Sequence, residues 1–186
     1  MGHGAYPARL GHSRFVPEEV TPIADSAVKP IPEGYHSLTP SLTVRGAADA
    51  IEFYKRAFGA VEISRALAPD GKRLWHAELQ IGDSRMMLTD EMPEMGSHAP
   101  APTGAVGFSV WLYVGDVDAV FERAVKAGAK SQMPVNDTFW GDRFGGLQDP
   151  YGHNWAIATR KENLTEDEVR RRADAFTASM SAGQQT

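Results

Sequence analysis

The sequence predicts an α+β fold in which two copies of one βαβββ module pack together. Two observations carry this prediction. Strand-like stretches and one amphipathic helix follow each other in the same order twice. The two predicted helices also align at a constant offset, which places Asp118 over Asp49 and Gly128 over Gly59. Because one module alone would leave part of its apolar surface without a cover, we expect the two to pair.

The first module begins with a β-rich stretch of alternating residues at 38–44. The helix predicted at 47–58 gathers its apolar residues on one face, and Gly59 ends it. Three strands follow, at 60–66, 74–81 and 85–89. The Asp70-Gly71 pair predicts a hairpin turn between the first two of these.

The second module repeats this order. A strand is predicted at 108–114, and Asp116 is a favourable N-cap for the following helix. Apolar residues at helical spacing give this helix one buried face, and Gly128 ends it. Three more strands are expected, near 130–135, 139–147 and 153–159.

The chain therefore divides into three parts. Residues 1–34 are rich in proline and glycine and are expected to form an arm, which is either a tail or a segment packed along this domain or a second subunit. The two modules occupy 35–95 and 104–160. Residues 161–186 hold a separate helix that starts at a Thr165-x-x-Glu168 capping box.

Composition excludes several functional classes. Among 186 residues, 19 Lys and Arg against 24 Asp and Glu give a net charge of −5, which argues against a nucleic-acid partner. Without cysteine there is no disulfide framework, thiolate nucleophile or cysteine metal ligand. No apolar run approaches the roughly 18 residues of a membrane span, and no secretory signal is visible. We therefore expect a cytoplasmic protein with no membrane partner.

Four stretches together resemble the vicinal oxygen chelate superfamily, which includes glyoxalase I, bleomycin-resistance proteins and extradiol dioxygenases, and within it the PhnB-like branch. They are the segments 42–60, 76–91, 112–129 and 139–159. The resemblance implies that each sheet curls into half a barrel, that a ligand cup lies on its concave face, and that the protein is a homodimer.

The resemblance also implies where a divalent metal would bind. Its ligands would come from Thr39 and Ser109 on the first strands and from positions near Leu88 and Ala156 on the last strands. None of these four side chains is a good ligand for a divalent cation, so we expect no cofactor at the usual positions. An off-pattern metal site built from His76, Glu78 and Glu91 is the alternative.

Strand alternation predicts which side chains line the cup. These are Thr39, Ser41, Thr43, Met86, Leu88, Asp90, Ser109, Trp111, Tyr113, Asn154, Ala156 and Ala158. An aromatic, hydroxyl-rich lining suits a planar or amphipathic organic ligand, although Trp111 and Tyr113 could instead pack into the core.

Two further clusters contain side chains that could take part in catalysis or substrate binding. His76 and Glu78 share one strand face and could act as an acid–base pair. Trp140, Asp142 and Arg143 could orient a substrate carbonyl or carboxylate, or could form a structural clamp in a glycine-rich turn.

Three functions are consistent with these features. The first is a small-molecule-binding protein of the bleomycin-resistance kind with a degenerate metal site. The second is a glyoxalase-type lyase or isomerase acting on a carbonyl substrate, in which a metal or the His76–Glu78 pair polarises the carbonyl. The third is an accessory subunit that uses the arm and the last helix to contact another protein.

Overall fold

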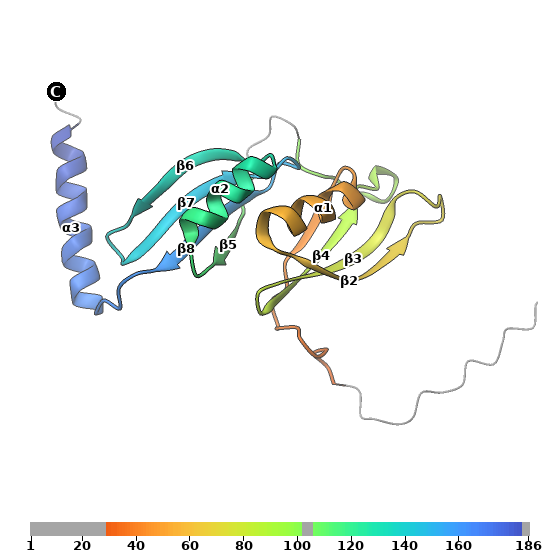
Figure 1. Ribbon diagram of the computed structural model, residues 1–186, viewed down its shortest axis with the longest axis horizontal. Helices are drawn as coiled ribbons and strands as arrows, with labels where there is room; N and C mark the ends of the chain where they lie inside the picture. Colours follow the sequence, from red (N-terminus) through yellow and green to blue (C-terminus); the bar gives the residue numbers. More distant parts are fainter. Residues whose placement is uncertain (1–28, 102–105, 184–186) are drawn as a thin grey trace, which may run out of the picture. The chain divides into compact units, whose positions relative to one another are not determined.

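The computed structural model describes residues 29–101 and 106–183 (Figure 1). All helices and strands below belong to one compact unit. The expectations for an arm over residues 1–28 lie outside the described residues. None of the described helices is both long and apolar enough to cross a membrane.

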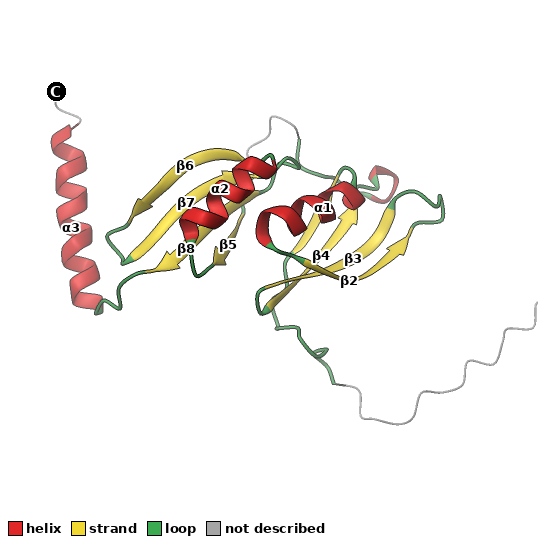
Figure 2. Cartoon of the chain, in the orientation of Figure 1, coloured by secondary structure: helices red, strands yellow, loops and turns green. Residues whose placement is uncertain are grey.

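The predicted fold class is confirmed: the chain is α+β and contains two βαβββ modules (Figure 2). The elements of the first are β1 (Ser41–Val44), α1 (Ala47–Phe58), β2 (Val61–Leu67), β3 (Leu74–Ile81) and β4 (Ser84–Asp90). Those of the second are β5 (Ser109–Tyr113), α2 (Val117–Ala127), β6 (Lys130–Asp137), β7 (Asp142–Gln148) and β8 (Asn154–Arg160).

Each module forms one four-stranded sheet, in the order β1-β4-β3-β2 or β5-β8-β7-β6. The first strand of each module runs parallel to the last, and the remaining neighbours are antiparallel. Neither sheet closes into a barrel, so β1 and β2 are the edge strands of the first sheet, and β5 and β6 are those of the second. Each helix covers one face of its own sheet and leaves the other face open.

One hydrophobic core joins the two modules. The ring of Phe58 on α1 lies 4.5 Å from that of Trp155 on β8, and Tyr54 lies 5.5 Å from the same indole. The Tyr54 hydroxyl donates a hydrogen bond of 2.7 Å to Asp149, which is also buried and belongs to the second module. The paired arrangement expected from the repeat is therefore built around α1.

Two strands start three residues later than the sequence predicts. β1 begins at Ser41 because Pro40 has no backbone N–H to donate to a sheet. β7 begins at Asp142 because Thr138 to Gly141 form a turn, in which the Thr138 N–H donates to the Asp142 carbonyl at 2.8 Å. Gly141 has a φ of 89°, a conformation that favours glycine.

The last helix, α3 (Glu166–Gly183), starts at the predicted capping box. The Thr165 hydroxyl accepts the N–H of Glu168 at 3.3 Å. Farther along, the ring of Phe176 packs 5.5 Å from that of Phe139, next to the β6–β7 turn. This contact ties α3 to the second module.

Candidate functional site

The open face of the second sheet carries the side chains that alternation predicted for it. Val110, Leu112 and Trp155 point toward the core, so their neighbours along the strands point to the opposite side. The open-face residues form the adjacent pairs Ser109 with Asn154, Trp111 with Ala156 and Tyr113 with Ala158. These positions form the candidate ligand site.

Four aromatic side chains on this face form what we call the aromatic floor: Trp111, Tyr113, Trp140 and Phe144. The rings of Trp111 and Phe144 are stacked at 4.9 Å with an interplanar angle of 8°. Tyr113 lies 6.1 Å from Trp111, and Trp140 lies 6.3 Å from Phe144. Trp111 is 44% exposed and Tyr113 is 55% exposed, so neither packs into the core.

A buried carboxylate holds the aromatic floor in place. Asp142 accepts hydrogen bonds from the Tyr113 hydroxyl at 2.9 Å and from the Trp140 indole N–H at 3.0 Å. The Arg160 Nε lies 3.1 Å from its other oxygen and balances the charge. Burial, together with the bond to Asp142, raises the pKa of Tyr113, so its hydroxyl stays a donor. Asp142 therefore fixes the orientation of two of the four rings.

Arg143 does not join this site. Its side chain lies on the opposite face of β7, toward α2, where it binds both carboxylate oxygens of Asp118 at 2.7 and 2.8 Å. It also reaches Asp137 at 3.2 Å. The structure therefore does not bring Asp142 and Arg143 together, because consecutive strand residues point to opposite faces, and the ion pairs of Arg143 agree with the structural alternative.

A polar group lies at the other end of this face. The Asn154 side chain donates to the Val106 carbonyl at 3.2 Å. Its Oδ1 is buried and has no hydrogen-bond partner among the described residues. Ser109 lies beside Asn154 on the neighbouring strand β5.

The expected lining from the first module needs a correction. Met86, Leu88 and Asp90 are all buried on the α1 side of their sheet. Leu88 pairs with the buried Leu42, whereas Met87 pairs with Ser41 on the open face. The offset that aligns the two helices also places Met87, not Leu88, over Ala156. The fourth metal position is therefore a methionine, which is not a typical ligand for a hard divalent cation.

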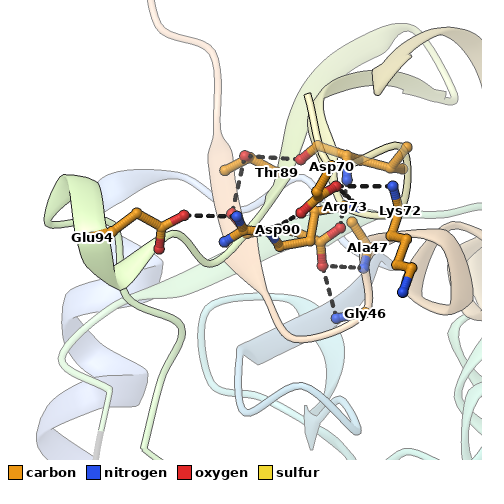
Figure 3. A network of polar contacts seen from close by, with 9 residues as sticks. Gly46, Ala47, Asp70, Lys72, Arg73, Thr89, Asp90 and Glu94 are labelled. Atoms are coloured by element: carbon orange, nitrogen blue, oxygen red, sulfur yellow. Dashed lines mark hydrogen bonds and ion pairs between the residues drawn. The ribbon is translucent and has the colours of Figure 1, made fainter. Parts of the chain in front are cut away.

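Asp90 has a structural role instead (Figure 3). Gly46, which precedes α1, has no capping side chain, so Asp90 Oδ1 accepts the N–H groups of Gly46 and Ala47 at 2.9 and 2.8 Å. Its Oδ2 accepts the Leu74 N–H at 2.7 Å. A carboxylate at a helix N-terminus is stabilising. In the second module Thr159 stands at the position equivalent to Asp90 and accepts the first helical N–H of α2.

His76 and Glu78 do lie together on the open face of the first sheet. His76 Nε2 is 3.4 Å from one oxygen of Glu78, and Arg85 lies 3.4 Å from the other. The guanidinium of Arg85 lies 5.0 Å from the centre of the Tyr35 ring. The contact with Tyr35 is the main cause that lowers the pKa of Glu78, so this carboxyl group is ionised at neutral pH.

Glu91 is not part of this cluster, because its side chain forms an ion pair of 2.7 Å with Arg45. In residues 29–101 and 106–183, no three His, Asp or Glu side chains are grouped closely enough to hold a metal ion. The structure therefore brings together two of the three off-pattern candidates.

A cavity of about 400 Å³ lies between the first-module segment around Thr39 and the edge strand β5. Trp111 and Tyr113 border it from the second module, and Arg85 borders it from the first. The Thr39 hydroxyl is engaged with the His36 carbonyl at 3.1 Å. Sequence reasoning missed Phe144, which alternation along β7 places on the open face. It also missed Arg85, whose face is decided by the register of β4.

The chain matches the family described as the Glyoxalase/Bleomycin resistance protein/Dioxygenase superfamily over residues 35–157, and it therefore belongs to this superfamily. It is 43% identical over 136 residues to the uncharacterized protein Mb0911c of Mycobacterium bovis, covering 72% of this chain and 89% of that one. The crystal structure of TioX from Micromonospora sp. ML1 is 26% identical in sequence, with a TM-score of 0.52, and the match covers 66% of this chain and 97% of that one.

A PhnB protein from Bacillus cereus shares the fold at 20% identity, with a TM-score of 0.53, and the match covers 67% of this chain and 99% of that one. These similarities agree with two βαβββ modules. The last helix, α3, begins after the end of the family match at residue 157.

Proposed function

We propose that this chain is a small-molecule-binding protein of the PhnB-like, bleomycin-resistance kind, and that a planar organic ligand stacks on the aromatic floor. The observation that supports this most is the exposure of Trp111 and Tyr113 on a sheet face opposite the core. Large aromatic side chains that remain exposed in one group mark binding surfaces more often than isolated ones do.

The residues at the superfamily's metal positions favour binding over metal-assisted catalysis. Thr39, Ser109, Met87 and Ala156 supply no imidazole and no carboxylate, which are the side chains that bind zinc and related cations. The ligand would instead be held by stacking and by burial of apolar surface.

The proposal includes a homodimer. Both sheets have an open face, and each has two edge strands, β1 and β2 in the first sheet and β5 and β6 in the second. A second copy placed against these faces would turn an open aromatic surface into an enclosed cup and would cover the unpaired strand edges. Sedimentation velocity on the full chain tests this part, and a monomer at micromolar concentration would contradict it.

Thermal-shift measurements with indole as the probe test the proposed site. A ligand at 100 times its dissociation constant adds about 2.7 kcal/mol of stability, which such measurements detect. We expect Trp111→Ala to abolish the shift. The matched control is Trp75→Ala, since Trp75 is 46% exposed but lies on the first module. Equal shifts in both variants, or none in the unmodified chain, would contradict the proposal.

A second candidate function rests on the contact between His76 and Glu78. If this pair is an acid–base catalyst for a glyoxalase-type lyase or isomerase, the unmodified chain converts an α-keto aldehyde and His76→Gln does not. Since His76 is partly exposed, the substitution is expected to leave the fold intact. Turnover that survives His76→Gln would remove this candidate.

A further inference from the structure

Ring contacts continue beyond the aromatic floor into α3. The ring of Trp140 lies 4.9 Å from that of Phe139 in an edge-to-face arrangement, and Phe139 lies 5.5 Å from Phe176. Trp140 is therefore a neighbour of both Phe144 and Phe139 in this series. The sheet and the last helix present one connected series of aromatic rings.

The face of α3 that continues this series is apolar and only partly covered. Phe176 and Met180 are four residues apart and therefore lie on the same side of the helix. They are 50% and 55% exposed, although Phe176 already packs against Phe139. An exposed apolar stripe next to an exposed aromatic surface forms one larger binding area.

Polar contacts hold α3 beside the β6–β7 turn. The guanidinium of Arg172 donates two hydrogen bonds to Glu162, at 2.9 and 3.0 Å, and a third to Glu168 at 2.8 Å. The backbone N–H of Glu162 in turn donates to the Gly141 carbonyl at 3.0 Å. The helix is thus attached to the same turn that carries Phe139 and Trp140.

The charged groups along this series are paired with each other. Asp142 is matched by Arg160, and Glu162 is matched by Arg172. A ligand that lies across these rings meets no uncompensated charge from either pair. The surface is therefore suited to an uncharged aromatic molecule rather than to an anion or a cation.

We propose that Phe139, Phe176 and Met180 form a second aromatic station, and that the ligand is an uncharged molecule with two linked ring systems. One ring system stacks on the aromatic floor and the other contacts the second station. This inference rests on the proposed function. It adds a second contact site to the stacking site, so that the ligand must be long enough to reach both. Phe176 is then a residue that determines specificity.

Two neutral probes test the inference by isothermal titration and by fluorescence: indole, which has one ring system, and N-phenyl-1-naphthylamine, which has two. We expect Phe176→Leu to weaken binding of N-phenyl-1-naphthylamine about fivefold and to leave indole unchanged. Leucine keeps the apolar contact with Phe139, so α3 remains folded. The matched control is Phe108→Leu, since Phe108 is 54% exposed but lies outside both stations.

The outcomes separate this inference from the proposed function. If Trp111→Ala weakens both probes and Phe176→Leu weakens neither, the second station is refuted and the aromatic floor stands. If Phe176→Leu weakens both probes equally, α3 acts only on the structure of the floor, and the inference is wrong. If Phe176→Leu alters the sedimentation coefficient but not the affinity for either probe, the apolar stripe of α3 binds a second copy of the chain, and the inference is wrong. If Trp111→Ala weakens neither probe, the proposed function itself is refuted.

Discussion

The hydrogen bond between Tyr54 and Asp149 joins the two modules inside the core, and Tyr54→Phe removes only this bond. Both residues are buried, and the bond is 2.7 Å long. A hydrogen bond to a charged group contributes about 1.5–3 kcal/mol. Asp149 Oδ2 keeps the bond from the Trp155 indole at 2.9 Å, so the carboxylate is not left without a partner. We therefore expect the free energy of unfolding to fall by about 2 kcal/mol.

Urea unfolding followed by tryptophan fluorescence measures this loss, and thermal unfolding should show a midpoint lower by about 4–8 °C for a chain of this size. Tyr151→Phe is the matched control, because the Tyr151 ring packs against the same aromatic cluster but its hydroxyl makes no hydrogen bond within the described residues. If both variants lose the same free energy, or if Tyr54→Phe unfolds at the same urea concentration as the unmodified chain, the bond does not stabilise the module pairing.

Two other predictions concern stability. Gly141→Ala should lower the free energy of unfolding by about 1–3 kcal/mol, because the new Cβ would lie 2.8 Å from the Glu162 carbonyl oxygen and the φ of this residue is positive. Thermal unfolding measures this loss. The control is Gly115→Ala, whose Cβ would have no atom within 4 Å and whose stability should differ little from that of the unmodified chain. Burial opposes ionisation of Asp149, but bonds and contacts from neighbouring donors outweigh it and lower its pKa. Since the carboxyl group has a pKa near 4 in the unfolded chain, the stabilisation that comes from the lowered pKa is present above about pH 4. It is lost as the pH falls through the pKa of the folded protein. Urea unfolding from pH 7 to pH 2 should therefore show that Tyr54→Phe and the unmodified chain converge at the acidic end, and a constant difference would contradict the assignment.

The open face of the second sheet could be predicted from the sequence because β5 and β8 alternate without interruption. Since Leu112 faces the core, its neighbours Trp111 and Tyr113 face the other side, and Asn154 follows from Trp155 in the same way. The prediction for the first module failed at β4, because the strand register decides whether Met87 or Leu88 lies on the open face. That register is fixed by the pairing of Leu42 with Leu88.

Asp142 and Arg143 show that the prediction for the second module also depended on where a strand begins. Their adjacency in the sequence suggested one polar cluster, but the β6–β7 turn ends at Gly141 and the strand starts at Asp142. From that point the two side chains take opposite faces. One fixes the aromatic floor, and the other binds Asp118 on α2.

By itself, the sequence determined the two βαβββ modules, the ends of their helices and the capping box of the last helix. These features depend on local periodicity and on residues close in the chain. Only the tertiary structure decided that Asp149 bonds to Tyr54 across the modules, that Asp90 caps α1, and that Phe176 packs against Phe139. Each of these contacts joins residues far apart in the chain, and their proximity follows from packing and strand register rather than from any local pattern.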